Sequence, residues 1–343
     1  MKKTIVFILL ISFFAGCKKH STDALTGQTN IIDGLELTFI KSNLQKSFNT
    51  VYFLNENTGY LAGSDGSMYK TVDGANSWTA LNTNTSLPLY DIYFLNSNEG
   101  FAVGGEANCS GTGCIPKGAV IIHTTDGGQT WSPLSVTTSE KIELKSICFP
   151  TNSLGFAVGY GSILTTKDGG VNWQETKIND LGGIMMDVKF LDKQKGLIAC
   201  TFGKLLKTTD GGTNWNVSSP FPQIGANTLA LVNDNLIFSA GYTNIEKSSD
   251  FGTTWSNLPG YPTDIFKLIF KSENTGYAFG RGQYSGGDFG RNYGAIYFTN
   301  DGGSTWKGSN QIQEIGMIES ASFPTANVGY AISGNIVIKI KKQ

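Results

Sequence analysis

Hydrophobic and polar residues alternate along short segments of this chain, and the same set of segments returns about every 40 residues. In one copy, residues 91–95 alternate between polar and apolar, 100–104 and 119–124 are mostly apolar, and Trp131 follows a glycine-rich turn. Alternation with a period of two is typical of half-buried β-strands. Each copy therefore predicts four short strands, named A to D in chain order.

An eleven-residue unit covers the end of strand A and all of strand B. It starts with Phe or Leu, and its successive starts are 41, 55, 41, 41, 39 and 53 residues apart. A period near 40 built from short strands indicates a β-propeller or another repeat array. The seven copies are residues 53–63, 94–104, 149–159, 190–200, 231–241, 270–280 and 323–333.

A second repeat lies between strands C and D and holds all six tryptophans of the chain. Its glycines supply the positive φ angles of a turn, and its aspartate can accept hydrogen bonds from nearby backbone amides. The tryptophan is large enough to cover the space between neighbouring sheets. We interpret the repeat as structural, with calcium binding by the aspartates as the alternative. The pairs are Asp73 and Trp78, Asp126 and Trp131, Asp168 and Trp173, Asp210 and Trp215, Asp250 and Trp255, and Asp301 and Trp306.

The seventh unit lacks the tryptophan phrase. Residues 318–323, 328–332 and 335–340 predict three strands before the chain ends, and residues 35–40 offer a fourth from the other end. Closing the ring in this way removes the exposed strand edges of an open array. The sequence thus predicts an all-β fold, a seven-bladed propeller over residues 34–343 whose last blade is closed by the N-terminal strand.

The tryptophan phrases resemble the Asp-box, or BNR, repeat of sialidase-like propellers. The combined unit resembles the photosystem II stability/assembly factor (Ycf48-like) group, and the resemblance covers about residues 34–341. It implies a protein-binding scaffold without catalytic chemistry. In that group partner contact is associated with an arginine-rich surface, whereas this chain has only Arg281 and Arg291. The resemblance therefore implies the fold and not a photosystem partner.

The N-terminus carries the pattern of an export signal. Two lysines precede an apolar run that is too short to span a bilayer as a mature helix. The run ends in a segment that resembles a bacterial lipobox, with Phe14 in place of the usual Leu and Cys17 as the lipidated residue. We predict a lipoprotein signal peptide at 1–17, a polar tether at 18–33 and, because Lys18 follows the cysteine, an outer-membrane lipoprotein of a bacterial cell envelope. An ordinary secretory signal is the alternative.

Charge and composition narrow the function classes. The formal net charge is −1, and nucleic-acid binding normally needs a basic patch. The only histidines, His20 and His123, are far apart, so we expect no metal site, and no cofactor motif is present. We expect a monomer in which Cys109 and Cys114 form a disulfide after export.

Two enzyme classes share this fold and are alternatives to a scaffold. Sialidases hold their substrate carboxylate with three arginines, and two cannot supply that triad. Asp91 and Asp187 occupy the same repeat position at the start of strand A, near the expected channel mouth. Two carboxylates that flank a sugar can act as acid and base, so a glycoside hydrolase or lyase remains the alternative function.

Blades two and six each carry about twelve extra residues between strands B and C. In a propeller these loops share one face with the D–A loops, and the Asp-box turns lie on the other. Arg and Tyr are common anchors of interfaces. We predict that the two loops bind a protein or glycan partner, with a tolerated surface insertion as the alternative. The candidate residues are Glu106, Asn108, Lys117, Arg281, Tyr284, Asp288, Arg291 and Tyr293.

Overall fold

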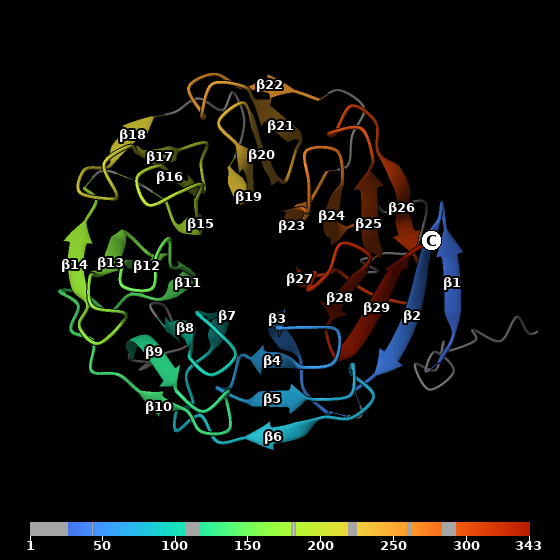
Figure 1. Ribbon diagram of the computed structural model, residues 1–343, viewed down its shortest axis with the longest axis horizontal. Helices are drawn as coiled ribbons and strands as arrows, with labels where there is room; N and C mark the ends of the chain where they lie inside the picture. The colour runs from blue at the N-terminus through green and yellow to red at the C-terminus, as the bar shows by residue number, and fades with distance from the viewer. Residues whose placement is uncertain are drawn as a thin grey trace, which may run out of the picture.

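Seven sheets stand around a common centre in the computed structural model of the chain (Figure 1). The structure describes residues 27–42, 44–106, 117–179, 181, 183–218, 225–258, 263–282 and 293–343. Within these residues every regular element is a β-strand, as the alternation predicts. The predicted all-β, seven-bladed propeller is confirmed.

Six of the sheets in the described part have four strands joined in simple up-and-down order, with strand A innermost. Blade one is β3 (Phe48–Phe53), β4 (Gly59–Gly63), β5 (Met68–Thr71) and β6 (Thr79–Leu81); blade two is β7 (Leu89–Phe94), β8 (Gly100–Glu106), β9 (Gly118–Thr124) and β10 (Ser132–Pro133); blade three is β11 (Leu144–Cys148), β12 (Gly155–Gly159), β13 (Ser162–Thr166) and β14 (Gln174–Lys177). Blade four is β15 (Met185–Phe190), β16 (Gly196–Cys200), β17 (Leu205–Thr208) and β18 (Asn216–Ser218); blade five is β19 (Ala226–Asn233), β20 (Leu236–Gly241), β21 (Ile245–Ser248) and β22 (Ser256–Asn257); blade six is β23 (Ile265–Phe270), β24 (Gly276–Arg281), β25 (Gly294–Thr299) and β26 (Lys307–Ile312).

The seventh blade joins the two ends of the chain. Its C-terminal strands are β27 (Ser320–Ser322), β28 (Val328–Ser333) and β29 (Ile336–Lys342), and β2 (Leu35–Lys41) pairs antiparallel with the whole of β29. Leu35, Leu37 and Phe39 are fully buried in the core that blades six and seven share. The predicted closure of the ring by the N-terminal strand is therefore confirmed.

A fifth strand lies outside β2, within the segment assigned above to the tether. β1 (Thr29–Ile32) forms a hairpin with β2 through a two-residue turn at Asp33 and Gly34, both with positive φ. This is the backbone of a type I′ turn, for which Asp-Gly is a preferred sequence. Asp33 Oδ2 also accepts a hydrogen bond of 3.0 Å from the N–H of Gly308 in blade six. The propeller thus begins at Thr29 and not at residue 34.

Aromatic side chains fill the space between neighbouring blades. At the interface of blades two and three, the Phe101 and Phe149 rings stack with centroids 4.9 Å apart, and Trp173 packs edge-on against both. Gly155 lies under Phe149, where an added Cβ would come within 2.4 Å of the ring. The glycine of the eleven-residue unit is therefore required by the aromatic residue that begins the unit.

The Asp-box turns are held by their own hydrogen bonds. In blade three, Asp168 Oδ1 accepts from the Thr166 hydroxyl at 2.8 Å and from the Asn172 N–H at 2.9 Å, while Oδ2 accepts from the Asn172 amide at 2.7 Å. These bonds hold the pKa of the Asp168 carboxyl at about 2. Equivalent bonds from backbone and side chains surround Asp73, Asp126, Asp210, Asp250 and Asp301.

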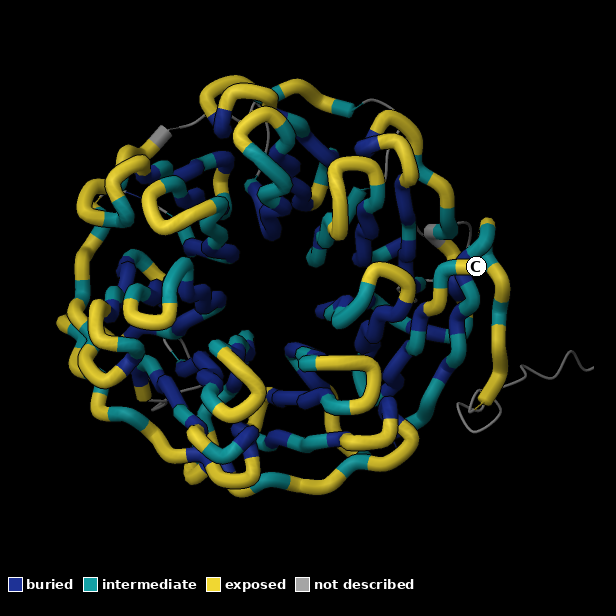
Figure 2. Tube along the Cα trace, in the orientation of Figure 1, coloured by how far each residue is buried: buried dark blue, intermediate teal, exposed yellow. Residues whose placement is uncertain are grey.

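The two faces of the ring differ. Each Asp-box turn bonds to the A–B turn of its own blade, as where Gly169 N–H donates to Ser153 O at 2.9 Å. The B–C and D–A loops meet on the opposite face, where Arg281 N–H donates to Asp264 O at 2.9 Å. Exposed residues concentrate in the turns and along the outer strands, while the middle of each blade is buried (Figure 2).

Candidate functional site: the central channel

The innermost strands of the seven blades line a channel with two connected chambers. The Asp-box-side chamber has a volume of about 360 Å³ and the loop-side chamber about 200 Å³. One residue from each blade, at the same repeat position, lines the loop-side chamber, and four of these seven residues also line the other chamber. We name this set the waist: Thr50, Asp91, Ser146, Asp187, Thr228, Lys267 and Ser320.

The waist side chains tie neighbouring blades together. The free edge of each innermost strand has backbone N–H groups that need acceptors. At five of the seven blade interfaces, whose innermost strands are all described, a waist oxygen accepts the N–H that follows the next blade's waist residue. These pairs are Ser320 with Val51 (3.3 Å), Asp91 with Ile147 (3.0 Å), Ser146 with Val188 (3.4 Å), Asp187 with Leu229 (2.9 Å) and Thr228 with Leu268 (3.3 Å).

Asp187 is the most enclosed charge of the waist, with 5% of its surface exposed. Lys189 Nζ lies 2.8 Å from its Oδ1, and the hydroxyls of Ser146 and Thr228 lie within 3.3 Å of its two oxygens. Burial disfavours the carboxylate, but the charges of Lys189 and Lys267 outweigh it and lower the pKa of Asp187. Burial likewise disfavours the Lys189 ammonium, while Asp187 and Asp91 raise its pKa. The pair is therefore held in its charged form.

The two carboxylates predicted as a possible acid and base are brought together. Ser146 Oγ lies 3.1 Å from Asp91 Oδ2 and 3.2 Å from Asp187 Oδ1. They lie in the waist and not at the mouth, because each serves as an acceptor for the next blade. A glycosidase acid needs a raised pKa, whereas the pKa of Asp187 is lowered. The arrangement suits blade-to-blade bonding better than proton transfer.

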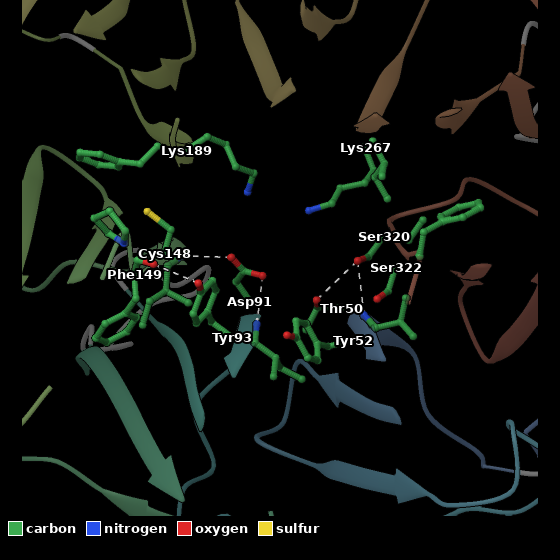
Figure 3. Close-up of a pocket in the computed structure, with 18 residues that line it drawn as sticks. Thr50, Tyr52, Asp91, Tyr93, Cys148, Phe149, Lys189, Lys267, Ser320 and Ser322 are labelled. Atoms are coloured by element: carbon green, nitrogen blue, oxygen red, sulfur yellow. Dashed lines mark hydrogen bonds between the residues drawn. The ribbon is translucent and has the colours of Figure 1, made fainter. Parts of the chain in front are cut away.

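Lys267 is the exception in the waist, because an ammonium group cannot accept an N–H. Its side chain lines both chambers, and Figure 3 shows its amine pointing toward the channel centre, as does that of Lys189, with Asp91 below them. Lys189 is paired with Asp187, but no carboxylate lies within ion-pair distance of Lys267 among the described residues. The repeat spacing gives Lys267 the same position in blade six as Asp91 has in blade two, but the sequence alone assigns it no role. Its being the one basic residue there was the available signal.

The Asp-box-side chamber has mixed polar and apolar walls. Tyr52 and Tyr93 contribute half-buried aromatic side chains, while the rings of Phe149, Phe190 and Phe323, which also adjoin it, pack between blades. The Tyr93 hydroxyl is used, since it donates to Phe149 O in the next blade at 3.0 Å. Cys148 also lines the chamber as a free thiol, and burial raises its pKa to about 12. A thiol with that pKa is a poor nucleophile at neutral pH.

The predicted loop site lies on the loop face and is described only at its ends. Lys117 Nζ lies 3.8 Å from Glu106, and Arg281 pairs with Asp264 at 3.2 Å while 37% of its side chain stays exposed. Gly282 N–H donates to Tyr293 O at 2.7 Å, which joins the two ends of the blade-six loop. Six further predicted residues lie outside the described residues: Asn108, Tyr284, Asp288, Arg291, and the disulfide candidates Cys109 and Cys114. Cys17, the predicted lipidation site, also lies outside them.

The described segments hold neither a cluster of metal-binding side chains nor a helix that could span a membrane. Over these segments, no group of three or more His, Cys, Asp or Glu side chains is arranged to hold a metal ion. In the same part of the chain, no helix has the length and apolar character needed to cross a membrane.

Comparison with known proteins agrees with the repeat analysis. The family model of the photosynthesis system II assembly factor YCF48 matches residues 113–220. A structure of YCF48 bound to a D1 peptide superposes with a TM-score of 0.67 at 18% identity, covering 90% of this chain and 97% of that one. YCF48 from Cyanidioschyzon merolae gives a TM-score of 0.67 at 15% identity, covering 88% and 98%.

Enzymes share the architecture at a greater distance. The GH74 enzyme of Niastella koreensis superposes with a TM-score of 0.63 at 18% identity, and the match covers 88% of this chain but 53% of that enzyme. No protein of curated function is significantly similar in sequence. Identities this low establish the fold alone. The chain is thus a seven-bladed β-propeller in which residues 113–220 match the family model of the assembly factor YCF48.

Proposed function

We propose that this protein is a non-catalytic scaffold that binds a protein partner in the bacterial cell envelope. The observation that carries the proposal is the match of residues 113–220 to an assembly-factor family, inside a fold that superposes over nearly its full length on a YCF48 with a bound peptide. The waist supports it further, because five of its seven side chains bond one blade to the next. Such a ring is a rigid frame that can present loops without carrying chemistry.

The partner surface that we propose is the loop face of blades two and six. Arg281 combines an exposed guanidinium with a fixed position, because Asp264 orients it. Arginine and tyrosine side chains dominate the binding energy of many interfaces. A protein partner is favoured over a glycan because the sequence match is to an assembly factor and the glycosidase likeness is to about half of a larger enzyme.

Export and anchoring complete the proposal and rest on the sequence. Lipidation of Cys17 would fix the N-terminus to a membrane, with the residues before Thr29 as the link to the propeller. Each buried methylene contributes about 0.8 kcal/mol, so several acyl chains hold a protein firmly. The Cys17→Ser variant is expected in the soluble fraction, and a variant that stays on the membrane would require a different anchor.

Glycoside cleavage is the alternative function. The proximity of Asp91 and Asp187 favours it, but the hydrogen bonds and the Lys189 pair on Asp187 argue for a structural role. The Asp91→Asn variant retains a side-chain oxygen acceptor. Any polysaccharide-cleaving activity of the wild-type protein that Asp91→Asn abolishes would support the enzyme instead.

Photo-crosslinking in native membranes tests the scaffold. A benzophenone amino acid replaces Tyr293 on the loop face, and a matched variant carries it at Val171, which is 73% exposed in an Asp-box turn. We expect one protein to be crosslinked from Tyr293, identified by mass spectrometry, and lost when Arg281, Tyr284 and Arg291 become alanine. The melting temperature should change little, since exposed ion pairs contribute about 0–1 kcal/mol. Crosslinks from neither position would contradict a scaffold role.

A further inference from the structure

Lys267 gives the waist a feature that the ring itself does not require. The equivalent residue in five blades is a Ser, Thr or Asp that bonds to the next blade, and Lys267 is the one waist residue that cannot accept the N–H of its neighbour, Ala321. A threonine at this position could accept that N–H and join blades six and seven. The side chain of Lys267 instead brings a positive charge to the floor of the Asp-box-side chamber.

The other charges of the waist are already engaged. Lys189 and Asp187 form a pair at 2.8 Å. Asp91 accepts two backbone N–H groups, from Ile92 and Ile147, each at 3.0 Å. Lys267 acts on Asp187 only at longer range, forms no ion pair among the described residues and is half-buried, so its ammonium group can meet a ligand.

Two hydroxyls lie beside Lys267 in the chamber lining. Thr50 Oγ1 and Ser320 Oγ are 3.5 Å apart, and both residues line the same chamber as Lys267. One hydroxyl donates to the other, and Ser320 Oγ also accepts the Val51 N–H, so the proton of the second hydroxyl remains for a ligand. An ammonium and a hydroxyl together match the two oxygens of a carboxylate.

The surroundings select among anions. Asp91 lines the same chamber, so its charge disfavours a dianion such as phosphate more than a monoanion. The walls above include the half-buried side chains of Tyr52 and Tyr93, which favour an apolar group attached to the anion. A volume of about 360 Å³ lies within the usual range of small-ligand pockets and has room for a few residues of an extended chain.

We infer that the Asp-box-side chamber binds the C-terminal end of an extended polypeptide, with its carboxylate on Lys267 and the hydroxyl of Thr50 or Ser320 and its last apolar side chain against Tyr52 and Tyr93. This inference rests on the proposed function, since it assumes a protein ligand. It adds a second contact, on the face opposite the blade-six loop. A small carboxylic acid carries the same anionic group, and the experiment below distinguishes it from the end of a polypeptide.

The experiment measures binding of three probes by NMR titration: the tripeptide acetyl-Gly-Ala-Phe with a free carboxylate, its C-terminal amide, and acetyl-Phe alone. We expect the tripeptide acid to bind at least about tenfold more tightly than the amide, because the amide has no carboxylate to pair with the Lys267 ammonium group. It should also bind more tightly than acetyl-Phe. Equal binding of acid and amide, or no binding of any probe, would overturn the carboxylate site. Equal binding of acetyl-Phe would overturn the polypeptide assignment.

Variants tie the effect to one residue. Lys267→Thr restores an acceptor for Ala321, so we expect it to melt no lower than the wild type while losing the preference for the acid. Lys267→Met serves if the threonine variant does not fold. Lys307→Thr, an exposed change on the outer strand of the same blade, should bind like the wild type. A Lys267→Thr variant that still prefers the acid would overturn the inference. Crosslinking of a partner from Tyr293 with no probe binding would leave the proposed function standing without this site.

Discussion

Asp187 Oδ2 accepts the backbone N–H of Leu229 from the next blade at a distance of 2.9 Å. The aspartate thereby serves the same purpose as the serine and threonine residues at its repeat position elsewhere in the ring. Its charge is matched within the channel and is not exposed at a mouth. This bond links blade four to blade five and gives a residue that the sequence offered as a possible catalytic carboxylate a structural contact.

Replacing Asp187 with alanine should therefore cost stability. The change leaves the Leu229 N–H without its acceptor and Lys189 without its partner, and breaking a buried pair typically costs about 3–5 kcal/mol. Asp187→Ser is the matched control, since it keeps an acceptor as Ser146 does and should lose less. Urea unfolding measures both. Because the pKa of Asp187 is lowered in the fold, its contribution is present above the ordinary carboxyl pKa and is lost as the pH falls below it. Identical midpoints for wild type and alanine variant would contradict the role.

Gly155 and Phe149 should behave as one unit. A methyl group on Gly155 would overlap the Phe149 ring, so Gly155→Ala is expected to destabilise by about 1–3 kcal/mol. Blade five shows which pair of residues avoids this overlap, because Leu231 and Ile237 occupy the equivalent paired positions there. Adding Phe149→Leu to Gly155→Ala should recover part of the loss. A double-mutant cycle by thermal unfolding that gave purely additive effects would contradict the coupling.

Glu246 should make the fold less stable as the pH rises. Its side chain is buried, and burial raises the pKa of Glu246 from 4.5 to about 7. A carboxyl that is harder to ionise in the fold stabilises fully below pH 4.5, and that contribution disappears as the pH rises through 7. We expect the melting temperature to fall between pH 5 and about pH 8, with up to about 3 kcal/mol at stake. Glu246→Gln should flatten this dependence. An unchanged slope in the variant would assign the effect to another group, with Glu319 the next candidate because its pKa is also raised to about 7.

The N-terminal strands should differ in importance. A chain that starts at Leu35 loses only β1, whose Ile31 is 64% exposed, and is expected to fold with a small loss. A chain that starts at Ser42 also loses β2 and the burial of Leu35, Leu37 and Phe39, each contributing about 1.5–3 kcal/mol. It also exposes the edge of β29, which favours aggregation. Size-exclusion chromatography and thermal melting distinguish the two truncated chains. If the chain that starts at Ser42 is monomeric and as stable as the full chain, β2 is not needed to close the ring.

Calcium should not stabilise the Asp-box turns. The oxygens of Asp301 already accept from the Thr299 and Thr305 hydroxyls and from the Thr305 N–H. Neither a chelator nor added calcium is expected to move the melting temperature, whereas Asp301→Ala should lower it by a few degrees. The internal bonds hold the pKa of Asp301 at about 2, so they persist until the solution is acidic. A chelator-induced drop that the alanine variant no longer shows would assign an ion to the turn.

The repeats made most of the fold readable from the sequence. Period-two alternation marks strands, and the recurring eleven-residue unit and Asp-to-Trp phrase mark where they turn, so these patterns predict the blade number and the closure. The hairpin at Asp33 and Gly34 also has a local signal, a preferred turn sequence flanked by isoleucine and leucine. The polar composition of residues 18–33 favoured a tether, so the sequence did not predict the extra strand β1.

The sequence by itself determined which residues share a repeat position, because that is a matter of counting along the chain. It could not determine what those residues do, because their hydrogen-bond partners belong to the next blade. Which atoms meet there depends on how far one sheet is offset from its neighbour. Only the tertiary structure decided that Asp91 and Asp187 meet across Ser146 and accept backbone N–H groups. The same offset decides that Lys267, the one lysine at this repeat position, points its ammonium group into the channel.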